Sequence, residues 1–170
     1  VDAIYIPLPN HLHVEWARKA IEAGKHVLCE KPIALQAGEI DELIQLRDTS
    51  GLLLAEAYMI VHHPQWQHAK ELLQSGVIGD LIQVDGVFSY NNSNDPTNIR
   101  NGAATGGGSP FVREECNLQT FSFPSDNHYV KQLEAFCSSV KDGVDYPCTL
   151  EFSKGTQHMI DMVFAKEKSG

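Results

Sequence analysis

Residues 26–32 read His-Val-Leu-Cys-Glu-Lys-Pro, a short apolar run that ends in a carboxylate, an amine and a proline. The apolar run predicts a buried strand over His26 to Glu30. This strand ends before Pro32, because proline cannot extend a central strand. Lys31 then lies just past the carboxyl end of that strand. In open parallel α/β sheets, ligands bind in the crevice beyond the carboxyl ends of the strands. Lys31 is therefore a candidate for proton transfer or for orienting a substrate hydroxyl.

The segments on either side of this strand carry helix patterns. Residues 12–23 and 37–49 place apolar side chains at helical spacing, and Gly24 and Gly51 follow them as typical helix stops. Each predicted helix therefore ends at a glycine, and the predicted strand over His26 to Glu30 lies between the two helices.

Two further strands complete the first part of the chain. The apolar runs at residues 2–8 and 52–57 predict strands before and after the helices. Strand, helix, strand, helix, strand is the arrangement of a parallel sheet. Residues 1–58 therefore predict an α/β fold, the C-terminal half of a doubly wound, Rossmann-type dinucleotide-binding domain.

The second part of the chain, residues 59–170, has a different pattern. Residues 81–90 alternate between apolar and polar side chains, which predicts a half-solvated antiparallel strand. Helix patterns occupy residues 62–75, 129–140 and 149–164. The composition change near residue 60 predicts a domain boundary, followed by a partial α+β domain with a mainly antiparallel open sheet.

Composition excludes several classes of function. The net charge of −9, from 22 acidic and 13 basic residues, argues against a nucleic-acid or anionic-membrane surface. No apolar run reaches the roughly 18 residues that suggest a membrane span. The four cysteines include no C-x-x-C pair, which indicates reduced thiols and a cytoplasmic protein, with Cys29 as a small core residue.

The turn after the first strand is the second candidate site. Residues 7–13 read Pro-Leu-Pro-Asn-His-Leu-His. They follow the carboxyl end of the first predicted strand, as Lys31 follows the carboxyl end of the second. Asn10 and the backbone amides of this turn are candidates to contact a cofactor, and Asn10 is equally a candidate helix N-cap. The pair His11 and His13 meets the requirements of a metal site only weakly, since no third ligand is evident, so no metal is predicted. The fingerprint G-x-G-x-x-G is absent from the sequence.

Together these motifs resemble the Gfo/Idh/MocA oxidoreductases, the family of glucose–fructose oxidoreductase-like dehydrogenases. The resemblance covers nearly all of the chain, and the later residues of the chain are similar to the branch of sugar and dihydrodiol dehydrogenases. The matching segments are Asp2-Ala3-Ile4-Tyr5-Ile6, Pro9-Asn10-His11-Leu12-His13, residues 23–32 and Gly76-Val77-Ile78-Gly79.

The resemblance implies an NAD- or NADP-dependent enzyme that transfers a hydride to or from a hydroxyl-bearing carbon of a sugar or related cyclic diol. It implies that Lys31 is the catalytic lysine of a Glu-Lys-Pro motif. It also implies a homo-oligomer for the full-length protein. The cofactor-binding set that the resemblance implies is Pro9, Asn10, His13, Glu30, Lys31 and Pro32.

The chain also departs from the family pattern. The strands and the glycine-rich phosphate turn that open the family's sequence precede the position of Val1, so the chain is expected to begin mid-protein. After Pro110 the sequence passes directly to a family C-terminal region, which indicates an internal deletion near residues 110–111. We therefore expect weak cofactor binding and little turnover from this chain, and a non-catalytic binding or oligomerisation module is the alternative function.

Overall fold

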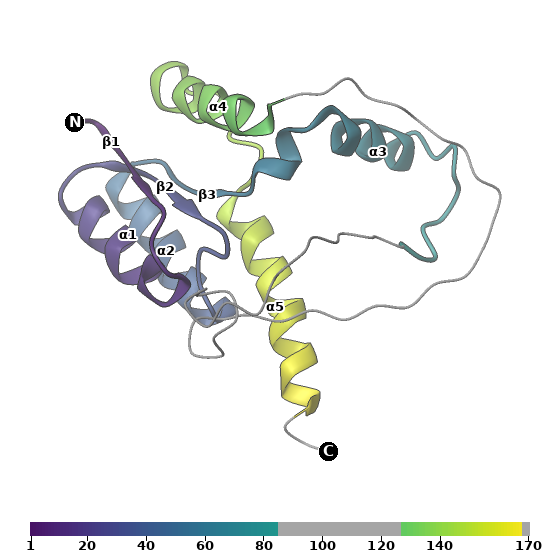
Figure 1. Cartoon of the computed structure of the whole chain (residues 1–170), viewed down its shortest axis with the longest axis horizontal. Coiled ribbons are helices and arrows are strands. Elements are labelled where there is room, and N and C mark those ends of the chain that lie inside the picture. Colours follow the sequence, from purple (N-terminus) through teal and green to yellow (C-terminus); the bar gives the residue numbers. More distant parts are fainter. Residues whose placement is uncertain (85–126, 168–170) are drawn as a thin grey trace, which may run out of the picture.

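The computed structural model describes residues 1–84 and 127–167, and its first part is a parallel sheet covered by helices (Figure 1). Three strands form the sheet, in the order β1-β2-β3, and both pairings are parallel. The elements are β1 (Ala3–Ile6), the 3-10 helix η1 (Asn10–Leu12), α1 (His13–Glu22), β2 (His26–Glu30), α2 (Ala37–Ser50), β3 (Leu54–Ala57), the 3-10 helix η2 (Met59–His62), α3 (Pro64–Gln74), α4 (His128–Asp142) and α5 (Leu150–Glu167).

Strand β2 has an apolar side chain on each face, because successive side chains of a strand point to opposite sides. Val27 and Cys29 face the core that α1, α2 and the start of α5 cover, whereas Leu28 faces the core beneath α4. All three are buried. A strand that is buried on both faces is typical of the centre of an α/β sheet.

The two helical layers come from different parts of the sequence. Helices α1 and α2 connect the strands and lie on one face, while α4 lies on the other face together with Tyr146 and Cys148. Helix α5 returns to the first layer and packs along α2, and its first residue, Leu150, is fully buried in that core. Helix α3 extends away from the sheet (Figure 1).

Most of the elements predicted from the sequence are confirmed. The three strands and the five helices form within a few residues of the predicted bounds, and Thr149 accepts a hydrogen bond from the Phe152 amide at the start of α5. The predicted antiparallel strand is different: residues 81–84 are not in a strand, and residues 85–90 lie outside the described residues. The predicted deletion point at residues 110–111 also lies outside them.

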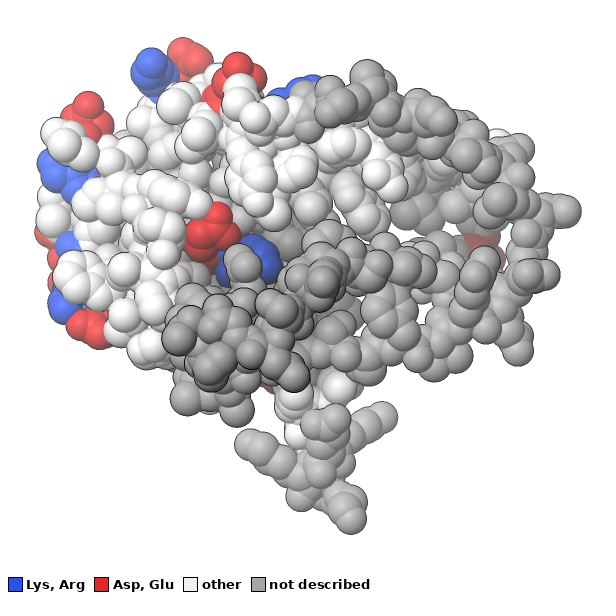
Figure 2. Space-filling view, in the orientation of Figure 1, with Lys and Arg blue, Asp and Glu red and all other residues white. Residues whose placement is uncertain are grey.

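The described helices give no candidate for a membrane span, because none combines sufficient length with sufficient apolar character. Figure 2 shows acidic and basic side chains interspersed over the described part of the face in view. Neither sign dominates the part of this face that the structure describes.

Candidate functional site

The carboxyl ends of the three parallel strands meet at one edge of the sheet. The register pairs Ile6 with Cys29 and Glu30 with Ala57, so the residues that follow each strand lie next to one another. This edge is where an open parallel sheet binds its ligands. The structure therefore brings the turn after β1, Lys31 and the start of η2 to one side of the molecule.

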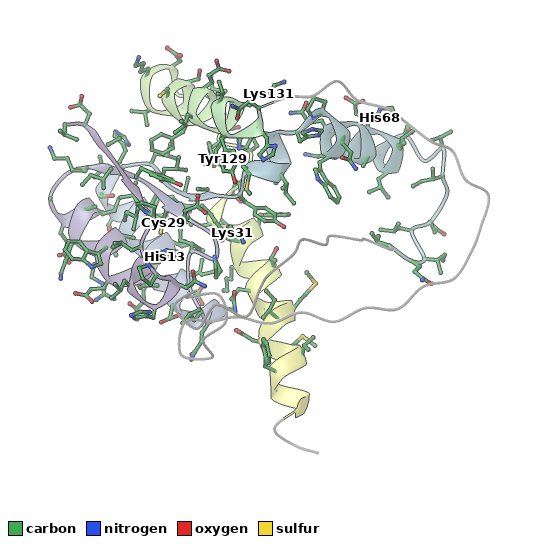
Figure 3. All side chains as sticks on the ribbon, viewed as in Figure 1. His13, Cys29, Lys31, His68, Tyr129 and Lys131 are labelled. Atoms are coloured by element: carbon green, nitrogen blue, oxygen red, sulfur yellow. The ribbon has the colours of Figure 1, made fainter. Side chains whose placement is uncertain are left out.

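Lys31 lies at this edge with an exposed side chain (Figure 3). It is among the residues that line a cavity of about 270 Å³. Within the described ranges, none of the ion pairs involves its ammonium group. The Lys31–Pro32 peptide bond is cis. The lining is Lys31, Pro32, Ile33, Ala34, Ile40, Glu56, Tyr58, Phe152, Ser153, Thr156, Gln157 and Ile160.

Glu30 is held by two hydrogen bonds. The Tyr5 hydroxyl on β1 donates to Oε1 over 2.5 Å, and the Lys31 amide donates to Oε2 over 3.3 Å. Burial and the Glu30 carboxylate raise the pKa of Tyr5 above its ordinary value, which keeps the phenol protonated as a donor. The carboxylate is thus fixed beside Lys31, and its remaining lone pairs can still accept a further hydrogen bond.

His13 joins the loops that follow β1 and β2. Its ring is completely buried, with Nδ1 2.7 Å from the Pro32 carbonyl oxygen and Nε2 2.7 Å from the Leu8 carbonyl oxygen. Each ring nitrogen thus lies within hydrogen-bond distance of a backbone carbonyl oxygen, to which a ring N–H can donate. The contacts of His13 are therefore with the two loops, whose backbones it links.

Pro9 and Asn10 lie half-buried in the turn after β1. The Pro9 carbonyl accepts from the Leu12 amide over 2.9 Å and so begins η1. The alternative role of Asn10 as a helix N-cap is wrong, because Leu12 holds the N-cap position of α1 and no side chain caps either η1 or α1. Asn10 stays a predicted cofactor contact.

Cys29 is a core residue, as predicted. It is completely buried, and burial raises the pKa of its thiol well above the ordinary value. A thiol in such surroundings stays protonated and unreactive. The chemistry of this strand end therefore belongs to the residues that follow Cys29.

Glu56 is a site residue that the sequence analysis missed. The residue is only 8% exposed, and its carboxylate accepts from the Ile33 amide over 2.8 Å and from the Ser153 hydroxyl over 2.6 Å. A carboxylate inside the apolar run Leu-Leu-Leu-Ala-Glu-Ala, residues 52–57, was the available signal. Buried acidic side chains need partners, so an acid in such a run indicates a specific contact.

Comparison with known proteins places the first part of the chain. Residues 1–58 match the family model of the oxidoreductase family with an NAD-binding Rossmann fold, GFO_IDH_MocA. An uncharacterized oxidoreductase of Rhizobium meliloti, ORF334, is 52% identical over 111 residues, which cover 65% of this chain and 33% of that protein. The dTDP-3,4-didehydro-2,6-dideoxy-alpha-D-glucose 3-reductase of Saccharopolyspora spinosa is 44% identical over 108 residues, which cover 64% of this chain and 32% of that protein.

A solved structure is also similar. It is the crystal structure of KijD10, a 3-ketoreductase from Actinomadura kijaniata, in complex with NADP and TDP-benzene. It is 46% identical, covers 47% of this chain and 25% of that chain, and has a TM-score of 0.43. The present chain spans about a third of the length of the two curated relatives described above.

The strand order, the matched residues and the identity to two oxidoreductases agree with one another. Residues 1–58 of this chain therefore match the NAD-binding Rossmann fold of the Gfo/Idh/MocA oxidoreductase family.

Proposed function

We propose that the edge around Lys31 is the nicotinamide side of an NAD(P)-dependent oxidoreductase site that acts on a sugar or related cyclic diol. The observation that carries the proposal is the position of Lys31, which lies past the carboxyl end of the middle strand and lines the cavity. The name of the Saccharopolyspora relative, a sugar reductase, supports the substrate class.

The residues present fit one end of a nicotinamide cofactor. Lys31 supplies an ammonium without an ion-pair partner in the described part of the chain, and Pro9 and Asn10 line the neighbouring strand end. The sequence contains no G-x-G-x-x-G turn to hold a pyrophosphate. Loss of that contact predicts weak cofactor binding by this chain.

The chain's own groups then have separate roles. Lys31 holds the substrate oxygen and moves a proton at that atom, while Glu30, His13 and Pro32 fix the backbone beside it. The Tyr58 phenol also lines the cavity, and burial raises its pKa, so it remains a hydrogen-bond donor at neutral pH. When bound, a nicotinamide cofactor supplies or accepts the hydride.

A deuteride-transfer assay tests this proposal with high sensitivity. The full chain is incubated with NADPH or NADH that carries deuterium at the transferable position, together with a panel of keto-sugars, and products are analysed by mass spectrometry. We expect slow deuterium incorporation that falls about a hundredfold in Lys31→Met, because the proton-transfer group is lost.

Lys25→Met is the matched control, since Lys25 precedes the opposite end of β2. This variant is expected to keep the rate of the unaltered chain. Incorporation no higher than in a protein-free sample, or an equal rate in the Lys31→Met and Lys25→Met variants, would contradict the proposal.

A second candidate function is a binding or oligomerisation module, and the outward surface of α5 favours it. Met159, Met162, Val163 and Phe164 are exposed there, and exposed apolar patches mark interaction surfaces. Light scattering after size exclusion measures the oligomeric state of the chain and of a Met162→Ser, Val163→Ser double variant. A defined oligomer that this variant dissociates, without deuteride transfer by the chain, would favour the module.

A further inference from the structure

The loop that carries Lys31 is held by a helix that lies far away in the sequence. Residues 31–36 connect β2 to α2, which begins at Ala37, and α5 begins at residue 150. We call residues 31–37 the loop, with Ala37 as its last residue. Three polar side chains of α5, at Ser153, Gln157 and Asp161, are spaced by four residues and therefore share one face of the helix. We call these three residues the polar stripe.

Each member of the polar stripe engages a backbone group of the loop or the carboxylate that holds it. The Gln157 amide group donates to the Leu35 carbonyl over 2.9 Å, and Asp161 accepts from the Ala37 amide over 2.8 Å. The Ser153 hydroxyl donates to Glu56, whose other oxygen accepts from the Ile33 amide. The stripe thus bonds to the backbone directly at positions 35 and 37, and it reaches position 33 through Glu56.

Burial makes these contacts strong and selective. Ser153 is 3% exposed and Gln157 is 7% exposed. No cation pairs with Glu56 among the ion pairs of the described residues, so its two hydrogen bonds offset the cost of burying the carboxylate. Loss of either hydrogen bond would leave the buried Glu56 carboxylate without a partner, at a cost in free energy. This cost favours the loop conformation in which both hydrogen bonds form.

The opposite side of the loop is held as well. His13 engages the Pro32 carbonyl, and Glu39 accepts from the amides of Leu35 and Gln36. The backbone between Pro32 and Ala37 therefore has partners on both sides, and the exposed side chain that remains free to meet a ligand at the start of the loop is Lys31.

We propose that the polar stripe and Glu56 are positioning residues that fix the loop and so set the place of the Lys31 ammonium in the cavity. The inference deepens the proposed function, because the same loop carries the proposed catalytic lysine. Helix α5 then both fixes the loop that carries Lys31 and packs against the core.

Nuclear magnetic resonance of the isotopically labelled full chain tests the inference without reference to activity. In Glu56→Ala we expect the Ile33 amide to exchange with solvent about tenfold faster, and in Asp161→Ala the Ala37 amide to do the same. Both variants are expected to shift the Lys31 Cε resonance. Glu56→Gln and Asp161→Asn retain an oxygen acceptor and are expected to restore the protection and the resonance.

Two further variants serve as references. His158→Ala changes an exposed residue outside the polar stripe and is expected to leave these signals unchanged. If Glu56→Ala fails to fold, Ser153→Ala removes only the hydroxyl and is expected to shift the same signals in the same direction. An unchanged Lys31 resonance in Asp161→Ala and in the folded member of the Glu56→Ala and Ser153→Ala pair would overturn the inference.

The deuteride-transfer assay separates this inference from the proposed function. Changed loop signals with no transfer by the unaltered chain would retain the positioning role and reject the proposed function. Transfer by the unaltered chain with unchanged loop signals in the variants would retain the proposed function and reject the positioning role.

Discussion

At the residue scale, buried polar side chains define the site more closely than exposed ones. His13 links the loops after β1 and β2 through two carbonyl oxygens, and Glu56 links the loop after β2 to α5. Each has its polar atoms paired, which is the requirement for a stable polar group in a core. The strand-end loops are therefore held by side chains beneath them.

His13→Leu is expected to destabilise the fold by about 2–4 kcal/mol, because the part-buried carbonyl groups of Leu8 and Pro32 lose the imidazole that lies within hydrogen-bond distance of both. The free energy of unfolding from urea titration checks this value. His11→Ala, at an exposed position in the same turn, is the control and is expected to change that free energy by less than about 0.5 kcal/mol. Equal effects of the two variants would contradict the role of His13.

His62 predicts a pH dependence of stability. It is buried, its Nε2 has no hydrogen-bond partner among the described residues, and burial lowers its pKa below the ordinary 6.5. The unfolded chain therefore binds a proton at a higher pH than the folded chain does. The His62 contribution is fully present above pH 6.5 and is lost as the pH falls toward the folded pKa.

His62→Phe keeps an aromatic ring beside Tyr146 and removes the titration. We expect its free energy of unfolding to fall less than that of the unaltered chain between about pH 7.5 and about pH 5. Urea titrations at both values measure the difference. An identical fall in both proteins would show that His62 does not titrate on unfolding.

Part of the candidate site could be proposed from the sequence and part could not, for a physical reason. Lys31 and Glu30 follow directly from the strand that precedes them. The partnership of Glu56 with Ser153 joins residues 97 apart in the sequence. Local patterns carry no information about which distant hydroxyl meets a buried carboxylate, so that contact needed the structure.

At the element scale, the two glycines at the start and at the end of α2 differ in backbone conformation. Gly51 ends α2 in the left-handed region with φ of 67°, whereas Gly38 lies in the first turn of α2 with a negative φ. A Cβ at either position meets no atom within 4 Å. The two sites therefore differ in backbone conformation and not in packing.

Gly51→Ala is expected to lower the free energy of unfolding by about 1–2 kcal/mol, because alanine resists the left-handed region. Gly38→Ala is expected to raise it by about 0.5–1 kcal/mol, because alanine favours the helix and restricts the unfolded chain. Thermal unfolding of the two variants checks the opposite signs. Changes of the same sign would contradict this assignment of the helix end.

The helix pattern of α5 was predictable, but its packing partner was not. Apolar spacing over residues 149–164 predicts a helix, and the same spacing suits a helix in either layer. The structure packs α5 along α2, with ion pairs from Arg47 to Glu151 and from Lys154 to Asp41. The Arg47 guanidinium lowers the pKa of Glu151 to about 2, so this pair stays charged at neutral pH.

Leu150→Ala tests how firmly α5 belongs to the core of the parallel sheet. The side chain is completely buried with residues of β2, α1 and α2, so its truncation is expected to cost about 2–5 kcal/mol. Val163→Ala, at an exposed position of α5, is expected to cost less than about 0.5 kcal/mol. Chemical denaturation measures both, and a small effect of Leu150→Ala would contradict the packing.

At the scale of the whole molecule, the parallel sheet was predictable and the later arrangement was not. Alternating strand and helix patterns over the first 58 residues predict a parallel sheet with crossover helices. The strand order β1-β2-β3 comes from the structure. After β3 the sequence offers helices without an order that fixes their layers. Helices α4 and α5 consequently take opposite faces of the sheet through contacts that only the folded chain reveals.

We propose that a nicotinamide cofactor binds this chain at the carboxyl end of β2. Backbone chemical-shift mapping of the labelled full chain during titration with NADPH tests it most directly. We expect weak binding, with the largest amide shifts at residues 10–13 and 30–33 and their loss in Lys31→Met. The largest shifts at the separate hollow lined by Arg18, Glu42 and Thr49, or shifts that persist unchanged in Lys31→Met, would contradict it.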